Sequence, residues 1–257
     1  MTLADGVVPT GATVVGAIVG SFLATLVIRW QRGRSVVRGR SCCDTCGRLL
    51  SARELVPLLS FALARGRCGR CGGAIDRRHS FIEAAAGLIG GAALALQPGL
   101  AGWAGALFGW GLLVLGAIDL ACFWLPDALT LPLALAGWAA GGLAIWPPVS
   151  DRLIGAAAGY ASLALLRWAY RRLRGREGMG GGDPKLLAAI GAWLGWQPLP
   201  LVVLVAALAG IGWFGIRCLR GVPVSLHDRL PLGTLLAGGA WLVWIIYALA
   251  RVSPLAV

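Results

Sequence analysis

Hydrophobic residues in this chain gather in long runs that are separated by short polar stretches. Eight apolar segments follow one another, at residues 7–28, 81–96, 103–118, 129–145, 153–166, 186–196, 201–216 and 231–249. A helix needs roughly 20 apolar residues to cross the hydrocarbon core of a bilayer. The pattern therefore predicts an all-α polytopic membrane protein with about eight transmembrane helices and a small polar insertion after the first.

The apolar segment at residues 186–196 is too short for a full crossing. Two explanations stay open. The helix extends beyond the apolar run, or a short helix leaves the polar residues at its start below the membrane surface and within reach of water.

Composition agrees with a membrane protein. The chain of 257 residues is 58% hydrophobic and 13% charged, with a mean hydropathy of +0.78. Its net charge of +12 would suggest nucleic acid in a soluble protein, but here it is interpreted as a record of orientation. We expect the lipid bilayer as a partner, no nucleic acid, and no cleaved signal peptide.

The distribution of Arg and Lys predicts that orientation. With the N-terminus outside, the inner loops fall at residues 29–79, 119–128, 167–185 and 217–229, and they hold 21 of the 23 Arg and Lys residues. Positive residues concentrate on the cytoplasmic side of membrane proteins. We therefore expect a multi-pass protein of the inner (plasma) membrane, and the inner loops place Asp119 and Asp183 at its cytoplasmic face.

The polar block at residues 29–79 contains two Cys-x-x-Cys pairs, Cys43 with Cys46 and Cys68 with Cys71. Two such knuckles offer four thiolates, which close a tetrahedron around Zn²⁺, and disulfides are rare in the cytoplasm. The block is predicted to be a zinc-ribbon-like domain with a structural zinc. Reduced thiols that only pack are the alternative. The remaining cysteines are interpreted as bystanders: Cys42, Cys122 and Cys218.

Glu83 lies about one turn into the second apolar segment. An acid inside a membrane segment is a functional candidate. At this depth it is equally well explained as an interfacial residue that pairs with Arg77 or Arg78.

Three acids stand at the cytoplasmic ends of apolar segments: Asp119, Asp127 and Asp183. Aspartic proteolysis needs two neighbouring carboxylates that share a proton, because two like charges in a poorly solvated site do not both ionise. Asp119 ends an apolar run, and Asp183 follows a glycine run that could take positive φ and admit a peptide. These two are predicted to form the pair. Asp127 either caps the helix that follows it or has a direct catalytic role.

The order of these parts resembles the bacterial prepilin peptidase family, which are intramembrane aspartic proteases of the Gly-x-Gly-Asp type. The resemblance covers nearly the whole chain. The matching pieces are Gly20-Ser21-Phe22-Leu23, the two cysteine pairs, Pro57-Leu58-Leu59-Ser60-Phe61, Ala117-Ile118-Asp119, Leu125-Pro126-Asp127, Leu129-Thr130-Leu131-Pro132 and Glu177-Gly178-Met179-Gly180-Gly181-Gly182-Asp183-Pro184-Lys185-Leu186-Leu187.

The resemblance implies a function and a division of the chain. Asp119 and Asp183 match the catalytic aspartates of an enzyme that removes the basic leader peptide, after a Gly, from type IV prepilins or type II secretion pseudopilins. Its domains would be a transmembrane helix at 1–28, the cysteine domain at 29–79 and the peptidase domain at 80–257. Support for the site is expected from Gly180, Gly181, Gly182, Asp127 and Lys185.

Many members of that family also methylate the new N-terminal residue, usually Phe, with S-adenosylmethionine, an activity associated with the cysteine domain. The sequence departs from the family there. Ala24 and Leu55 stand where the family usually has Asn. Loss of these side-chain hydrogen bonds could weaken methylation, so whether methylation is retained stays open.

Two other function classes fit parts of the sequence. A transporter would use membrane acids as a proton relay, but it predicts acids near the middle of a span. A zinc-ribbon assembly factor without catalysis predicts that Asp119 and Asp183 are replaceable. The oligomeric state and the particular pilin are not indicated by the sequence.

Overall fold

The computed structural model describes residues 3–33, 41–43, 45–221 and 230–252. Residues 34–40 and 222–229, which belong to two of the predicted inner loops, lie outside the described residues. The chain forms two compact units, Met1–Val114 and Leu115–Val257. The predicted domain limits at residues 28 and 79 stay predictions.

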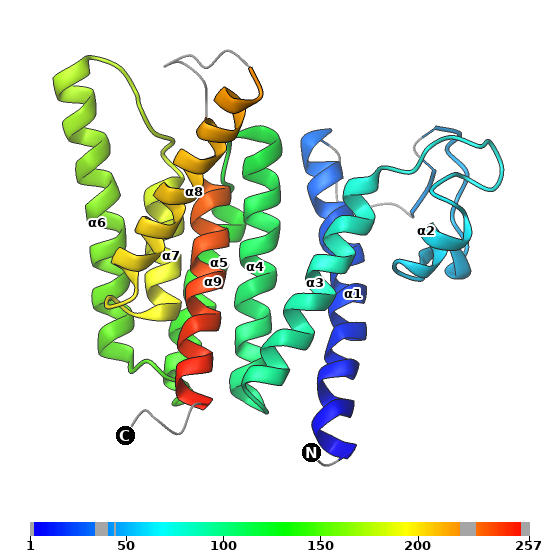
Figure 1. The fold of residues 1–257 in the computed structure, drawn as a ribbon, viewed down its shortest axis with the longest axis horizontal. Helices are drawn as coiled ribbons and strands as arrows, with labels where there is room; N and C mark the ends of the chain where they lie inside the picture. The colour runs from blue at the N-terminus through cyan, green and yellow to red at the C-terminus, as the bar shows by residue number, and fades with distance from the viewer. Residues whose placement is uncertain (1–2, 34–40, 44, 222–229, 253–257) are drawn as a thin grey trace. The chain divides into compact units, whose positions relative to one another are not determined.

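Each of the eight predicted apolar segments lies within, or largely within, one helix. These are α1 (Leu3–Gln31), α3 (Arg77–Leu96), α4 (Leu100–Cys122), α5 (Asp127–Gly142), α6 (Val149–Arg174), α7 (Asp183–Leu194), α8 (Leu199–Leu219) and α9 (Leu232–Val252) (Figure 1). Two short pieces lie in the cysteine region, the 3₁₀-helix η1 (Ala52–Leu55) and α2 (Leu59–Leu63). The all-α fold class is confirmed.

Among the described residues, five helices are long and apolar enough to cross a membrane: α1, α3, α4, α8 and α9. Helix α7 is different because it has only 12 residues. At 1.5 Å per residue it is roughly 18 Å long, well short of the bilayer core of about 30 Å. For the apolar segment at residues 186–196, the structure therefore favours the second explanation, in which the helix itself is too short to cross the bilayer.

In the first unit, α1 and α3 pack closely because small residues line their contact. A methyl group added at Gly20 would lie 2.7 Å from the Cα of Glu83, and one at Gly16 would lie 2.3 Å from the carbonyl oxygen of Ala86. No ordinary side chain fits at such distances. Small residues of this kind let helix backbones approach in a membrane.

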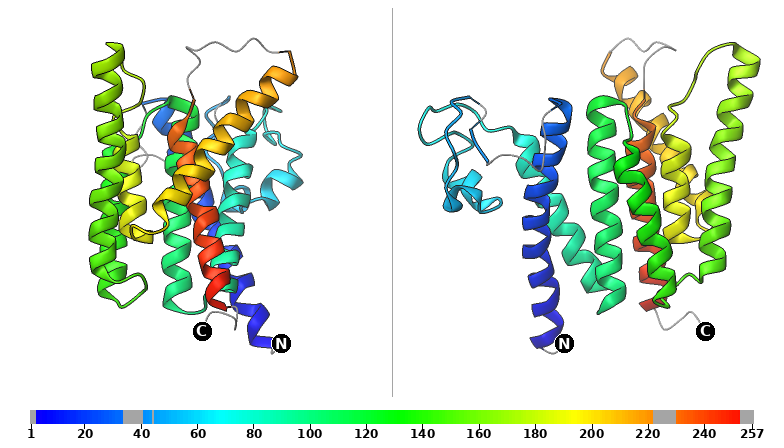
Figure 2. Two further views of the ribbon diagram at one scale, coloured as in Figure 1. Left: turned by 60° about the vertical axis from the view of Figure 1, so that its left-hand side comes forward. Right: turned by 180° about the vertical axis from the view of Figure 1, so that it is seen from behind.

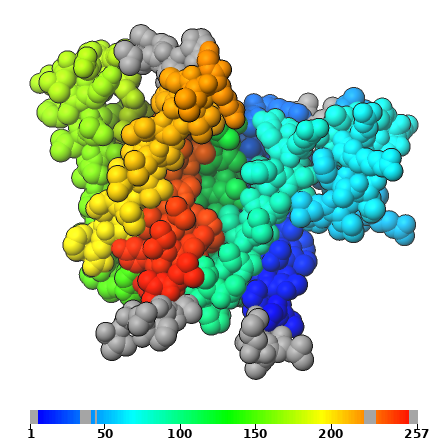
Figure 3. Space-filling view, viewed as in Figure 1, coloured from blue at the N-terminus to red at the C-terminus, as the bar shows by residue number. Residues whose placement is uncertain are grey.

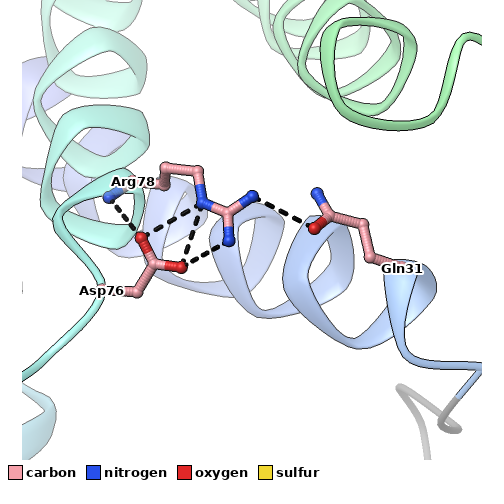
Figure 4. Close-up of polar contacts among 3 residues, drawn as sticks. All are labelled: Gln31, Asp76 and Arg78. Carbon is pink, nitrogen blue, oxygen red and sulfur yellow. Dashed lines mark hydrogen bonds and ion pairs between the residues drawn. The ribbon is translucent and has the colours of Figure 1, made fainter.

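A polar contact joins the end of α1 to the start of α3. Asp76 is the N-cap of α3 and accepts a hydrogen bond from the backbone N–H of Arg78. The Arg78 guanidinium pairs with the same carboxylate and donates to the Oε1 of Gln31 at 3.1 Å (Figure 4). Arg78 lowers the pKa of Asp76 through this contact. The cap thus fixes where α3 begins, about two turns before Glu83.

In the second unit, α7 lies against both α5 and α6 (Figure 2). Arg152 of α6 links the C-terminal parts of α5 and α7. Its buried guanidinium donates to the carbonyl oxygens of Gly137 in α5 and Ala192 in α7, at 2.7 and 2.9 Å. It also donates to the three consecutive carbonyl oxygens of Ile145, Trp146 and Pro147. The buried cation thus pairs with one carbonyl at the C-terminal end of α7 and with three carbonyls of the loop between α5 and α6, groups that are costly to leave without a partner in an apolar core.

Helices α8 and α9 pack on each other in the second unit (Figure 3). Helix α8 keeps many large apolar side chains on its outer surface, such as Leu204, Leu208 and Ile211. In water such a surface would be unfavourable. A lipid environment accounts for it.

Candidate active site and zinc centre

Asp119 lies in the last turn of α4 with only 5% of its surface exposed. Its Oδ2 accepts a hydrogen bond from the backbone N–H of Thr234 at 2.8 Å and lies 3.2 Å from the Thr234 hydroxyl. That hydroxyl also donates to the carbonyl oxygen of Gly116, at 2.8 Å. The carboxylate therefore occupies the N-terminus of α9, where the first N–H groups of a helix lack partners within it.

Gly233 makes this contact possible. A methyl group at this position would lie 2.9 Å from the Asp119 Cγ and 2.9 Å from Cδ1 of Leu125. Such contacts are too close for any side chain. The N-terminus of α9 reaches the Asp119 carboxylate only because residue 233 has no Cβ.

Asp183 is the first residue of α7 and is 7% exposed. Its carboxylate accepts a hydrogen bond from the backbone N–H of Gly180 and interacts electrostatically with Asp119. Leu125 connects the two positions, because its side chain contacts Gly182 before α7 as well as Gly233 in α9. The structure thus brings together two carboxylates that lie 64 positions apart, each at a helix N-terminus.

The glycine run owes its composition to close packing. Gly182 has φ −82°, and neither Gly180 nor Gly181 has positive φ. The prediction of positive φ in this run is wrong. A methyl group at Gly182 would lie 2.7 Å from Cβ of Leu125, and one at Gly181 would lie 3.1 Å from a guanidinium nitrogen of Arg167. The glycines are therefore needed where neighbouring groups approach the loop.

Arg167 of α6 anchors the loop that leads to Asp183. Its Nε donates to the Glu177 carboxylate at 3.1 Å, and Arg171 lies 3.6 Å from the same carboxylate. Arg167 lowers the pKa of Glu177, so that acid stays ionised at neutral pH. Arg167 is also close enough to Asp183 for an electrostatic interaction.

Asp127 does not cap α5. Pro126 holds the N-cap position, and Asp127 is the first helical residue. Its carboxylate pairs with the Nζ of Lys185 at 2.7 and 2.8 Å, and both side chains are exposed. The N-cap prediction is wrong because the side chain turns toward Lys185 in the first turn of α7. The pair joins the starts of the two helices.

The four cysteines of the two predicted pairs come together. Their Sγ atoms all lie within 4.8 Å of one another, and those of Cys43 and Cys71 are 3.8 Å apart. Four sulfurs bound at about 2.3 Å to a tetrahedral zinc stand about 3.8 Å from each other. The donor set and spacing therefore fit zinc.

The two knuckles repeat one backbone pattern. Cys43 N–H donates to the carbonyl of Arg48, and Cys68 N–H donates to that of Gly73, both at 2.8 Å. Each knuckle ends on a glycine with positive φ, Gly47 at +69° and Gly72 at +70°. Backbone N–H groups directed at the sulfur lower the pKa of the Cys68 thiol to about 6, whereas burial and the neighbouring thiols raise the pKa of Cys71 to about 11. Metal binding would favour the thiolate form of both.

Glu83 is buried and belongs to a polar cluster in the first unit. Its carboxylate accepts a hydrogen bond from the backbone N–H of Leu58 at 2.9 Å, lies 3.2 Å from Nδ1 of His79, and bonds to the Ser21 hydroxyl. The predicted pairing with Arg77 or Arg78 is wrong, because Asp76 takes the Arg78 guanidinium. Glu83 is instead a buried acid, as the other alternative predicts.

Sequence reasoning did not find Thr234, Gly233 or Leu125. A hint existed in Pro231-Leu232-Gly233-Thr234, where a glycine and a hydroxyl follow a proline at the start of an apolar run. Nothing in that pattern points to Asp119, which is 115 positions away. Likewise, nothing in the sequence distinguishes Arg167 from the other basic residues of the loop at residues 167–185.

Comparisons with known proteins identify the family. Residues 106–215 match the Type IV leader peptidase family, and residues 14–96 match the Bacterial Peptidase A24 N-terminal domain. No solved structure matches this chain.

Curated relatives match most of the chain. A prepilin leader peptidase/N-methyltransferase from Burkholderia pseudomallei (strain 1026b) is 41% identical over 263 residues, which cover 90% of this chain and 84% of the relative. Proteins of the same name from Aeromonas salmonicida (strain A449) and Pseudomonas putida are 44% and 36% identical. Those two alignments cover 80% and 91% of this chain and 71% and 88% of the relatives. The chain belongs to the Type IV leader peptidase family.

Proposed function

We propose that this protein is a membrane-embedded aspartic endopeptidase that removes the basic leader from type IV prepilins or type II secretion pseudopilins, after a Gly, at the cytoplasmic face. The observation that carries the proposal is the pair of buried carboxylates, Asp119 and Asp183, at two helix N-termini. The names of the relatives support processing of prepilins over transport or a non-catalytic assembly role.

The surroundings of the two acids suggest different roles. Asp119 accepts hydrogen bonds from the N-terminus of α9, and such donors favour the ionised form of a carboxylate. Asp119 is therefore the base that takes a proton from the attacking water. Asp183 carries the shared proton and donates it to the oxygen of the scissile carbonyl. The water oxygen bonds to the carbonyl carbon, the C–N bond then breaks, and the leaving amine receives a proton from the pair.

The loop before Asp183 offers a place for the substrate. Gly180 to Gly182 carry no side chains that would keep an extended peptide from the carboxylates. The Asp127–Lys185 pair borders the same helix start and supports its position. The Arg-rich inner loops would repel a basic leader. In this proposal they therefore face acidic lipid headgroups.

We further propose that the protein methylates the newly exposed N-terminal amine. S-adenosylmethionine would supply the methyl group when bound. The resemblance associates this step with the cysteine domain in the first unit, where Cys43, Cys46, Cys68 and Cys71 would hold a structural Zn²⁺. A closed site of four thiolates leaves no open position on the metal, so the zinc stabilises the domain and does not take part in the reaction.

Mass spectrometry of the product tests both activities. Membranes that contain the protein are incubated with a prepilin-like precursor and S-adenosylmethionine. The expected product starts directly after the Gly and carries one additional methyl group. Absence of any shortened product with wild-type protein would contradict the peptidase proposal, and an unmodified shortened product would contradict methylation.

Elemental analysis tests the metal. We expect one zinc per chain, because four thiolates complete one tetrahedron. The double variant Cys43→Ser, Cys68→Ser should lose the zinc, whereas Cys122→Ser should keep it. Equal zinc content in the two variants would reject the four-cysteine site.

A further inference from the structure

The first unit contains a cavity of about 200 Å³ between α1, the cysteine region and α3. Ser21 and Thr25 of α1 line it on one side, and His79 and Glu83 of α3 line it on another. Apolar side chains form further parts of the wall, among them Leu55. Such a mixture of apolar wall and a few polar groups is typical of sites for small groups.

The acids that line this cavity differ in their partners. Glu54 pairs with Arg48, and Asp76 pairs with Arg78. Glu83 is the most deeply buried of the three, and its described partners are the Leu58 N–H, the Ser21 hydroxyl and His79. A histidine is only partly charged near neutral pH.

A buried carboxylate is costly unless a cation balances its charge. Glu54 and Asp76 each pair with an arginine. Arg29 and Arg67 also line the cavity, but the partners described for Glu83 are two neutral donors and a histidine. Glu83 therefore retains attraction for a second cation that enters the cavity.

We propose that Glu83 binds the α-ammonium group of the newly exposed N-terminal residue in this cavity and accepts its proton before methyl transfer. This inference rests on the methyl transfer proposed above. An α-amine has an ordinary pKa of about 7.7–8.0, so the group arrives mostly as a cation. The ammonium group thus supplies the positive charge that would balance the buried Glu83 carboxylate.

The proton step makes the amine reactive. The ammonium passes one proton to the Glu83 carboxylate, and the freed lone pair on nitrogen forms the bond to the methyl carbon. The bond between that carbon and the sulfonium sulfur breaks, and its electron pair stays on the sulfur. The products are a methylated ammonium and the neutral thioether. His79, 3.2 Å from Glu83, holds the carboxylate in place.

The packing of α1 and α3 positions this acid. Gly20 allows the two backbones to approach at Glu83, which brings the Ser21 hydroxyl to the carboxylate. Leu55 makes the wall apolar at a position where the family usually has Asn. An apolar wall suits the hydrophobic first residue of a processed pilin.

Peptide binding tests the inference directly. The probes are a peptide that begins with Phe and has a free amine, and the same peptide with an acetylated amine. Wild-type protein should bind the free amine about 10- to 100-fold more tightly, the range expected for a hydrogen bond to a charged group. Glu83→Gln should lose this preference, and Glu83→Asp should restore part of it. Glu54→Gln, in the wall of the same cavity, should keep it.

Activity gives a second measurement. Glu83→Gln should methylate a pre-cleaved peptide at least about 10-fold more slowly and should cleave a precursor within about twofold of wild type. An unchanged preference for the free amine, or an unchanged methylation rate, in this variant would overturn the inference. Wild-type protein that cleaves but never methylates would contradict the proposed methylation, and the binding comparison would still decide the role of Glu83.

Chemical labelling needs no variant and covers the case in which Glu83→Gln does not fold. A carbodiimide activates a carboxyl group and joins it by an amide bond to an amine in contact with it, with the urea as the leaving group, and the modified residue is identified by mass spectrometry. The free-amine peptide should become linked to Glu83 in the wild-type protein, and the acetylated peptide should not. Equal labelling with both peptides would overturn the inference.

Discussion

Each unit of the protein buries a carboxylate against a glycine, and the two sites differ in what else is present. Glu83 in the first unit packs against Gly20 and has His79 beside it, whereas Asp119 in the second unit packs against Gly233 and interacts with a second acid, Asp183. The comparison teaches that a glycine at a helix contact places the acid, and the neighbouring group decides its chemistry. A carboxylate pair shares a proton, while a carboxylate beside a histidine remains an anion that attracts a cation.

Apart from replacement of the two aspartates themselves, the largest effect is expected from closing the glycine contact in the second unit. Gly233→Ala places a methyl group 2.9 Å from the Asp119 Cγ. Displacement of a reacting group by about 1 Å can lower the rate about 100-fold, so leader cleavage should fall by about that factor. Initial rates with a precursor peptide measure it. Gly238→Ala in the same helix is the control, because nothing lies within 4 Å of the added methyl group; an equal loss in both variants would contradict a local cause.

The corresponding change in the first unit should separate the two activities. Gly20→Ala forces α1 away from Glu83, since the added methyl group would lie 2.7 Å from its Cα. Overpacking of this kind costs about 1–3 kcal/mol, and methylation of a pre-cleaved peptide should fall about 10-fold while leader cleavage falls less. Gly11→Ala in α1 has no neighbour within 4 Å and serves as the control. A larger loss of cleavage than of methylation in Gly20→Ala would break the comparison.

The smallest effect is expected at the exposed ion pair that anchors the loop before Asp183. Arg167 lowers the pKa of Glu177, so the pair is complete at neutral pH and is lost only as the pH falls through that lowered pKa. Exposed pairs contribute little, and Glu177→Gln should slow cleavage by less than about threefold. Added salt should screen the pair, so the cleavage rates of the wild-type protein and Glu177→Gln should become more similar. A loss of tenfold or more that persists in high salt would give Glu177 a direct role in the site.

The two regions also differ in how much of them the sequence predicts. The four cysteines could be found from local spacing, because each Cys-x-x-Cys pair forms its own knuckle and the two knuckles only have to meet. The eight apolar segments likewise predict helices, since hydrophobicity is written along the chain. Both predictions agree with the described structure.

The carboxylate pair depends on contacts between distant helix ends, and no local pattern predicts those. Asp119 and Asp183 were paired through family resemblance. Thr234 was missed because its partner is 115 positions away. For Asp127 and Glu83 the sequence offers local partners as one alternative, a cap and a neighbouring Arg, whereas a lysine on another helix and the N–H of Leu58 bind them. Local rules fail where tertiary contacts supply the partner.

The most direct test of the central claim is the cleavage rate of Asp119→Asn, Asp183→Asn and the double variant. Groups that act as a unit are not additive. Each single variant should lose at least about 1,000-fold in kcat, and the double variant should be no slower than the slower single variant. Asp127→Asn, which alters an exposed acid beside the site, should stay within about threefold of wild type. A wild-type rate in Asp119→Asn or in Asp183→Asn would contradict the account.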